Sequence, residues 1–280
     1  MSEENRPKAN SKRTLEVVPN HGEMVKPSEL IEVKGAAKLS LADRRLYNVL
    51  LHNAFGPDLG TENRRFEIPL SELRDTHDSN DRLVQSIEAL MTTVVTMRRA
   101  DGSTDRVQLL GWNNLSDSKR KHGFLKYSIP PELAVLLRDS LVFAKLEMEV
   151  LRAFTSKYAL GLYEAVARRV RLQHIYSEKF DLDDFRELLG VEHDKLTTYG
   201  NLNQFAIKPA LLEVNALSNF LVSVEPVKQG RRVVGVMIGW SVKDIKGRKA
   251  AYAELQRSRI GRKSRVAETV EAIESDILLT

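Results

Sequence analysis

Cysteine is missing from the 280-residue sequence. Its absence excludes disulfide bridges, thiolate zinc sites and cysteine nucleophiles. The sequence also lacks an apolar run of about 18 residues, which a membrane-spanning helix would require. The first residues, MSEENRPKANSKR, have no apolar core of the kind that a secretory signal carries. We therefore expect a cytoplasmic globular protein that is associated with no membrane.

The sequence motifs of common enzymes are missing as well. There is no phosphate-binding glycine loop of the Walker type, no Gly-x-Ser-x-Gly elbow and no dinucleotide-binding glycine motif. The six histidines are scattered and lack the spacing of metal ligands. We therefore expect no enzymatic activity, no cofactor and no bound metal.

Two acidic clusters leave one enzymatic alternative open, a metal-dependent nuclease. The first cluster, RDTHDSND, spans 74–81, and the second comprises Asp181, Asp183, Asp184 and Glu187. Metal ligands normally converge from separate elements, whereas each cluster is one continuous stretch. The residue types of the first cluster suit turns and helix caps. The spacing of Asp184 and Glu187 is that of a variant capping box, which we favour.

The charge distribution favours a polyanionic partner. The net charge of +5 is mild, but eight lysines and arginines between 246 and 265 face a single acid, Glu254. All of them except Lys246 belong to a basic tail at 247–280, for which a solvated helix face and a phosphate contact are both open. Residues 1–37 have nearly balanced charge and few large apolar side chains. We expect them to form a mostly flexible arm with a short ordered piece near 29–33.

Two segments more than a hundred residues apart share one pattern. Ser40 precedes Tyr47, and Ser156 precedes Tyr163, by the same interval, and each tyrosine follows a leucine. Downstream, each copy continues with an extended piece and a short helix, a second helix, and a hairpin that ends on Gly-Trp. These pieces lie at 64–77, 79–95 and 94–112 in the first copy and at 178–191, 201–217 and 221–240 in the second. We interpret the repeated order as an internal duplication.

This order of elements is that of a winged helix, a variant of the helix-turn-helix. Each hairpin has a tight-turn signal, Asp101-Gly102 in the first copy and Gln229-Gly230 in the second. In such a domain the second helix of the pair lies in the major groove of DNA, and the hairpin reaches the flanking backbone. The predicted fold class is therefore α+β, with two tandem winged-helix domains related by duplication.

The second helix of each copy has a core face and a solvent face. Apolar periodicity predicts core positions at Leu83, Ile87, Leu90 and Met91 in the first copy, and at Leu202, Phe205, Ala210, Leu211 and Val214 in the second. Pro209 lies inside the second pattern, so we expect it to kink that helix or to separate its first turns.

Five stretches of the sequence resemble one known family. They are LYNVLL at 46–51, FTSKYALGLYE at 154–164, FDLDDFRELLGV at 180–191, IKPALLEVN at 207–215 and GRRVVGVMIGW at 230–240. These stretches are similar to those of the replication initiator (Rep) proteins of iteron-containing bacterial plasmids, and the likeness covers about 38–245. The resemblance implies two winged-helix domains, which we expect at 38–138 and at 139–246.

The resemblance also implies a function in plasmid DNA replication. Proteins of this family bind direct repeats (iterons) of double-stranded DNA at an origin, open the adjacent duplex and help to load host replication proteins. The expected partners are therefore origin DNA, the host replicative helicase and initiator, and chaperones, and the expected location is the nucleoid or the plasmid. The first domain is expected to form a homodimer that represses its own promoter and limits copy number. A tandem winged-helix repressor without a role in initiation is the alternative.

Candidate DNA-binding residues lie on the solvent face of the second helix of each copy and in both hairpins. In the second copy they also lie in the segment just before that helix. They are Arg82, Gln85, Ser86, Arg98, Arg99, Arg106, Lys195, Thr197, Thr198, Asn201, Asn203, Gln204, Lys208, Lys228, Arg231 and Arg232. Asn and Gln can pair with adenine, Lys can reach guanine or a phosphate, and residues beside a helix N-terminus can hold phosphates. The family often has arginines where this sequence has Asn203, Gln204 and Phe205, so the base preference stays open.

Overall fold

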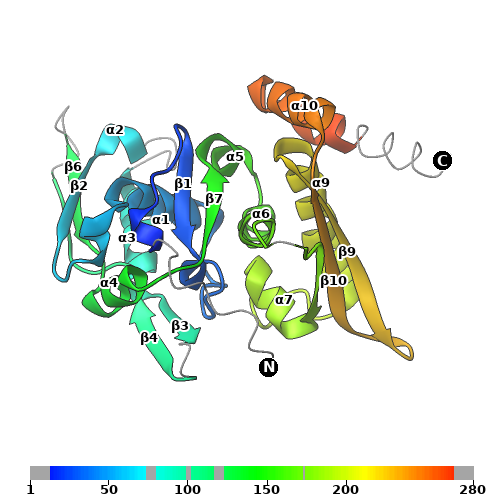
Figure 1. Cartoon of the computed structure of the whole chain (residues 1–280), viewed down its shortest axis with the longest axis horizontal. Coiled ribbons are helices and arrows are strands. Elements are labelled where there is room, and N and C mark those ends of the chain that lie inside the picture. The colour runs from blue at the N-terminus through cyan, green and yellow to red at the C-terminus, as the bar shows by residue number, and fades with distance from the viewer. Residues whose placement is uncertain (1–12, 74–79, 99–101, 117–122, 173, 268–280) are drawn as a thin grey trace. The chain divides into compact units, whose positions relative to one another are not determined.

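A computed structural model describes residues 13–73, 80–98, 102–116, 123–172 and 174–267 (Figure 1). The chain divides into two compact units, Met1–Leu146 and Glu147–Thr280. The division falls after residue 146 rather than at the expected position after 138, because strand β7 (Phe143–Glu147) pairs with β1 (Glu23–Pro27). In the described ranges, no helix is both long and apolar enough to traverse a lipid bilayer.

The first unit mixes short helices and strands. Its α-helices in the described residues are α1 (Leu41–Ala54), α2 (Leu70–Leu73), α3 (Asn80–Thr92) and α4 (Pro131–Arg138). Its further strands there are β2 (Arg65–Pro69), β3 (Val94–Arg98), β4 (Thr104–Gln108), β5 (Asn113–Leu115) and β6 (Phe124–Ser128).

The segment expected to be a flexible arm is largely part of the folded first unit. Strand β1 buries Met24 and Val25, and the buried ammonium of Lys26 donates to Asn48 Oδ1 of α1 at 2.9 Å. A 3₁₀-helix at Ser28–Leu30 occupies the position of the expected short ordered piece. The expectation of flexibility beyond residue 12 was wrong because average composition conceals a local apolar pair that can be buried against β7 and α1.

The winged-helix elements of the first unit follow the predicted order. Helix α1 is followed by β2, α2, α3 and the hairpin of β3 and β4, in which Thr96 lies opposite Arg106. Strand β2, however, pairs with β6, and β5 extends this sheet on the other side of β6. Together with the pair of β1 and β7, the described residues of the first unit therefore form three small sheets, where a minimal winged helix would have one.

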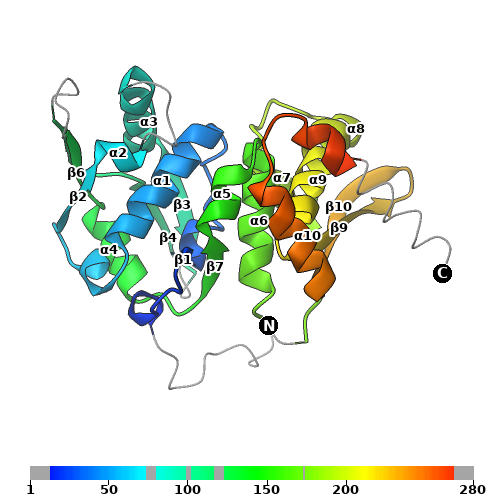
Figure 2. The ribbon, with the colours of Figure 1, turned by 90° about the horizontal axis from the view of Figure 1, so that it is seen from above.

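The second unit repeats the order with a longer hairpin (Figure 2). Its helices in the described residues are α5 (Met148–Ala153), α6 (Lys157–Arg169), α7 (Leu182–Leu189), α8 (Tyr199–Leu202), α9 (Lys208–Leu217) and α10 (Ile245–Gln256). Its strands there are β8 (Ser177–Asp181), β9 (Phe220–Gln229) and β10 (Arg232–Val242). The three strands form one antiparallel sheet in the order β8-β10-β9. The hairpin of β9 and β10 projects beyond α6 and α7 (Figure 1).

The repeated serine and tyrosine have the same structural roles in both units. Ser40 is the N-cap of α1 and accepts a hydrogen bond from the Asp43 amide, and Ser156 is the N-cap of α6. Tyr47 and Tyr163 lie two turns into these helices and are buried. Ser and Thr are preferred N-caps because their oxygens satisfy free amides in the first turn. The shared interval therefore corresponds to equivalent helices that begin each winged helix.

The shared Gly-Trp dipeptide, by contrast, occupies different places in the two units. Trp240 lies inside β10 and is buried, whereas Trp112 follows β4 and is 43% exposed. The amide of Gly111 donates to the Ser128 carbonyl, and the carbonyl of Trp112 accepts from Ser128, so this dipeptide pairs with β6. The dipeptide is thus no evidence for equivalent hairpin ends, although the order of elements is the same.

The expected basic tail begins with a structured part of the second unit. Asp244 caps α10 by accepting from the Gly247 amide at 2.7 Å. The guanidinium of Arg262 is buried and donates to the carbonyls of Glu254, Leu255 and Arg257 at the C-terminal end of α10. Arg262 of the expected tail therefore packs against the end of α10, because three carbonyls at a helix end need donors and Arg262 supplies them.

Candidate nucleic-acid interface

The second unit contains a continuous helical segment from Tyr199 to Leu217 that includes a π-turn. Helix α8 leads into the π-turn Asn203–Ile207, which leads into α9. The amide of Lys208 accordingly donates to the carbonyl of Asn203, five residues back instead of four. Following our sequence interpretation, we name this segment the recognition helix.

Pro209 explains the position of the π-turn. Proline has no amide hydrogen, and in an α-helix its ring clashes with the carbonyl four residues earlier, here that of Phe205. A π-turn before the proline widens the helix at this point. We expected Pro209 to kink the helix or to separate its first turns, and the structure shows that a wider turn accommodates the ring.

The recognition helix has a narrow buried stripe and a polar outer stripe. Leu202, Ala206, Ala210 and Val214 are fully buried at intervals of four residues. An α-helix has about 3.6 residues per turn, so a stripe at intervals of four drifts around it unless a wider turn corrects the phase. The exposed side chains are those of Asn201, Gln204, Phe205 and Lys208, and Asn203 is half-buried.

Phe205 corrects our prediction of the core face. Its side chain is 56% exposed, although the periodicity placed it inward. Leu211 was also expected inside and is only half-buried, whereas Leu202, Ala210 and Val214 are buried as predicted. The error arose because strict α-helical phase was assumed across the π-turn.

A buried arginine holds the loop that leads into the recognition helix. Arg186 of α7 donates from Nη1 to the Leu196 carbonyl at 2.6 Å and from Nη2 to the carbonyls of Glu192 and Lys195. The side chain of Thr198, the N-cap of α8, accepts from the Asn201 amide at 3.2 Å. The loop residues Lys195 and Thr197, like Thr198, are exposed beside this helix end. The pKa of Tyr199 is raised, mainly because its ring is partly buried and to a smaller extent because the carboxylate of Glu225 is near. Its hydroxyl therefore keeps its proton.

Two polar residues of the recognition helix tie it to the rest of the second unit. Glu213 accepts from the amide and the hydroxyl of Thr155, both at 2.6 Å, just before α6. The side-chain amide of Asn215 donates to the Val222 carbonyl at 2.9 Å and accepts from the Val222 amide at 2.8 Å. The Glu-Val-Asn end of the motif at 207–215 thus positions the helix against α6 and β9.

The hairpin of β9 and β10 ends in a two-residue turn of Gly230 and Arg231. Gln229 pairs directly with Arg232, which places the turn one residue later than the predicted Gln229-Gly230. Gly230 has φ +61°, a value that a two-residue hairpin turn needs and that glycine adopts without strain. A β-bulge lies between Val233 and Gly235, and bulges increase the local twist of a hairpin.

The cations of this interface have no anionic partner in the part of the chain that the structure describes. Lys195, Lys208, Lys228, Arg231 and Arg232 are exposed and make no ion pair with any residue that the structure describes. By contrast, the buried Arg169 is paired with Glu178 at 2.5 Å. Exposed, unpaired cations at the loop, the helix and the hairpin tip are available for an external anion.

Only some of the candidate residues of the first unit are exposed in the part of the chain that the structure describes. Arg82 and Gln85 of α3 and Arg106 of β4 are exposed. Ser86 is 4% exposed and its hydroxyl donates to Asp43 Oδ1 at 2.5 Å, so its assignment to a DNA-binding face was wrong. The structure describes only the backbone of Arg98, in β3, and Arg99 lies outside the described residues.

Neither acidic cluster forms a metal centre in the part of the chain that the structure describes. No group of three or more His, Asp or Glu residues is arranged there to hold a metal ion, and residues 74–79 of the first cluster lie outside that part. The expected capping box of Asp184 and Glu187 is also absent, because α7 begins at Leu182 with Asp181 as its N-cap.

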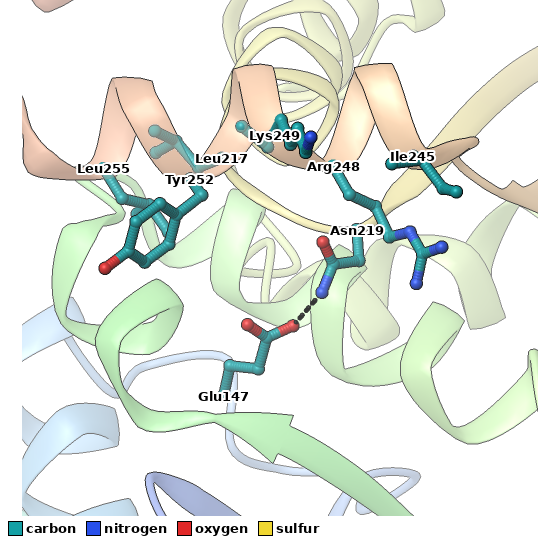
Figure 3. A pocket seen from close by; sticks show the side chains of 9 residues that line it. Glu147, Leu217, Asn219, Ile245, Arg248, Lys249, Tyr252 and Leu255 are labelled. Carbon is teal, nitrogen blue, oxygen red and sulfur yellow. Dashed lines mark hydrogen bonds between the residues drawn. The ribbon is translucent and has the colours of Figure 1, made fainter.

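A hollow of about 490 Å³ lies beside α10 (Figure 3). Two of the residues that line it are joined by a hydrogen bond, which Asn219 donates to Glu147 at 2.6 Å.

Each unit combines a helix-turn-helix with a β-hairpin, and together they define a tandem winged-helix protein. The family models described as Initiator Replication protein, WH1 and Initiator Rep protein, WH2 match residues 23–167 and 181–240. The chain belongs to this family of initiator Rep proteins. The predicted family and the predicted tandem winged-helix fold are thereby confirmed.

Two known proteins are similar to this chain. A replication initiation protein of Escherichia coli is 25% identical over 151 residues, which are 53% of this chain and 46% of that relative. The match therefore spans less than half of the relative. A solved structure described as the crystal structure of Pi initiator protein in complex with iteron DNA has a TM-score of 0.56 at 17% identity, and covers 81% of this chain and 100% of that chain. At this identity the likeness concerns the fold.

Proposed function

We propose that this chain is a plasmid replication initiator that binds direct repeats of double-stranded DNA at an origin. Membership of the initiator Rep family supports the role in initiation. The observation that carries the proposal is the recognition helix of the second unit. Its outer stripe presents amides and a lysine, and the hairpin that follows it carries cations that no acid of the described chain neutralises.

The two parts of this interface suit two kinds of DNA contact. Asn201 and Gln204 project from a helix of the width that the major groove admits, and their amides can pair with adenine. Arg231 and Arg232 lie at the tip of the hairpin, which in winged helices reaches the flanking backbone. The helix is therefore proposed to read bases and the hairpin to hold phosphates.

The remaining parts of the function follow from the family. We propose that bound protein opens the duplex beside the repeats and recruits the host replicative helicase and initiator, with chaperones acting on the protein. The first unit is proposed to form a homodimer that represses its own promoter. Arg82, Gln85 and Arg106 are proposed as its DNA contacts.

A replication assay tests the proposal. The DNA adjacent to the gene is placed on a selectable circle that has no other origin, and the protein is supplied from a second plasmid. We expect transformants only when both are present, and loss of transformants with the double variant Arg231→Ala and Arg232→Ala. Lys179→Ala removes an exposed cation of β8, away from the hairpin tip, and serves as the matched control.

The same strains distinguish initiation from repression. A promoter–reporter fusion measures whether the protein represses transcription from its own upstream region. Repression without transformants would favour the repressor and overturn the proposed role in initiation. Direct repeats beside an A·T-rich tract in the adjacent DNA are expected for an initiator.

A further inference from the structure

Phe205 is an exposed aromatic side chain on an otherwise polar helix surface. The side chain of Phe205 is 56% exposed, whereas the other apolar residues between 199 and 217 are buried or half-buried. A phenyl ring that stays in water forgoes the free energy that its burial would contribute. A protein–protein docking surface would need a contiguous apolar patch rather than a single ring.

The neighbours of Phe205 indicate what the ring can contact. Asn201 precedes it by one turn, Gln204 is adjacent and Lys208 follows by one turn, and all three are exposed. Asn and Gln side chains pair bidentately with adenine N6 and N7 in the major groove. The partner of each adenine presents the C5 methyl of thymine in that groove, where it is the one apolar group and is matched by apolar side chains. One ring among amides is thus complementary to A·T base pairs.

The π-turn accounts for the outward position of the ring. Phe205 lies at the centre of the turn Asn203–Ile207, three residues after the buried Leu202. In an unbroken α-helix, residues three apart share a face, so Phe205 would lie near the core stripe. The wider turn instead moves Ala206 and Ile207 into the core and leaves Phe205 outside. Such π-turns occur frequently at functional sites.

We propose that Phe205 is a specificity-determining residue that packs against a thymine methyl group in the major groove. The recognition helix then reads A·T pairs with two chemistries, amides on adenine and a phenyl ring on thymine. This inference rests on the proposed function, since it requires that the helix enters DNA. The inference adds to the proposed function that the recognition helix selects A·T base pairs.

Deoxyuridine substitution tests the contact at the level of one methyl group. A duplex is first enriched from a random pool with the full-length wild-type protein. Each thymine of this duplex is then replaced in turn by deoxyuridine, which removes the methyl and keeps the base pairing. At one thymine we expect affinity to fall about fourfold, the equivalent of one buried methyl group. Phe205→Ala is expected to weaken binding to the unmodified duplex about tenfold and to abolish this effect of deoxyuridine.

Two further variants separate a methyl contact from a general loss of surface. Phe205→Leu keeps an apolar side chain and is expected to keep most of the sensitivity to deoxyuridine. Tyr252→Ala removes an aromatic ring of similar exposure, 62%, from α10 and is expected to leave the sensitivity unchanged. Thermal unfolding of each variant verifies that the second unit is intact.

Each outcome bears on a different statement. Failure of the wild-type protein to enrich any sequence would overturn the proposed function and this inference together. Enrichment without any thymine sensitive to deoxyuridine, or a sensitivity that persists in Phe205→Ala, would overturn the inference alone. A change of oligomeric state in Phe205→Ala with unaltered methyl dependence would assign the ring to a protein contact, and would also overturn it.

Discussion

Side chains that face DNA either read bases or hold phosphates, and the two roles differ in how binding responds to sequence and salt. We expect Gln204→Ala to cost about 1–3 kcal/mol on the selected duplex and little on a scrambled one, because a base contact is lost. Arg231→Ala should weaken both duplexes alike and reduce the log–log salt slope by about one, because a phosphate contact is lost. Titrations of both duplexes at several salt concentrations measure the difference.

The half-buried Asn203 provides an internal comparison for this prediction. Because the side chain of Asn203 is half-buried and that of Gln204 is exposed, Asn203→Ala should affect specific binding less than Gln204→Ala. Lys208 can read guanine or hold a phosphate. The salt dependence of DNA binding by Lys208→Ala distinguishes these two roles, because only the loss of a phosphate contact reduces the log–log slope by about one. Gln204→Ala could instead weaken binding to both duplexes equally, while Arg231→Ala weakens binding only to the selected duplex. In that case Gln204 would hold a phosphate and Arg231 would read a base.

Lys243 gives the second unit a pH dependence of its own. The side chain is 8% exposed, and its ammonium donates to the carbonyls of Asn215 and, at 2.8 Å, Ser218 at the end of α9. Burial lowers the pKa of Lys243 from 10.5 to about 8. Between these values the unfolded chain holds a proton that the folded unit has released, so this group makes stability rise as pH increases.

Comparison with Lys243→Met isolates this contribution. The variant keeps the apolar stem but cannot titrate, so the part of the pH slope that comes from residue 243 should disappear. Urea unfolding of both proteins between about pH 7 and pH 10 gives the free energy of unfolding as a function of pH. The difference between the two slopes isolates residue 243, because the tyrosines contribute equally to both proteins. Identical slopes for the two proteins would contradict the lowered pKa.

At the scale of elements, α6 and α7 approach each other at Gly161. A Cβ at this position would lie 2.7 Å from the Leu188 carbonyl oxygen of α7. Gly161→Ala should therefore destabilise the protein by about 1–3 kcal/mol through overpacking, although alanine is the better helix former. Gly200→Ala in α8 meets no atom within 4 Å and should stabilise it by up to about 1 kcal/mol. Thermal or urea unfolding of the pair tests the opposite signs.

The elements that could be predicted are those with local signals. N-cap serines, buried tyrosines at a constant interval and a glycine in each hairpin turn lie close to one another in the sequence, and they predicted both winged helices. Non-local pairing left no such signal: Ser86 was assigned to DNA because nothing near it indicates Asp43 as its partner. The π-turn was missed because a period of 3.6 residues was assumed, although Leu202, Ala206, Ala210 and Val214 at intervals of four were the available signal.

For the whole molecule, two winged helices on one chain predict the size of the protected site. Helix-turn-helix units that occupy successive faces of the major groove lie about 10 bp apart, centre to centre. One chain should therefore protect roughly 20 bp of a direct repeat, including flanking backbone contacts. Hydroxyl-radical footprinting of the full-length protein measures this length. A stable footprint of about 10 bp would show that a single unit engages the DNA.

The paired hydrogen bonds between Asn215 and Val222 have a thermodynamic consequence. They join the base of the hairpin to the recognition helix, so the relative orientation of the helix and the hairpin is fixed when the second unit folds. The conformational entropy of arranging the two is then already lost in the free protein, and association does not have to supply it. For these two elements the heat capacity of binding should reflect the apolar surface that contacts DNA, without the large additional decrease that accompanies coupled folding.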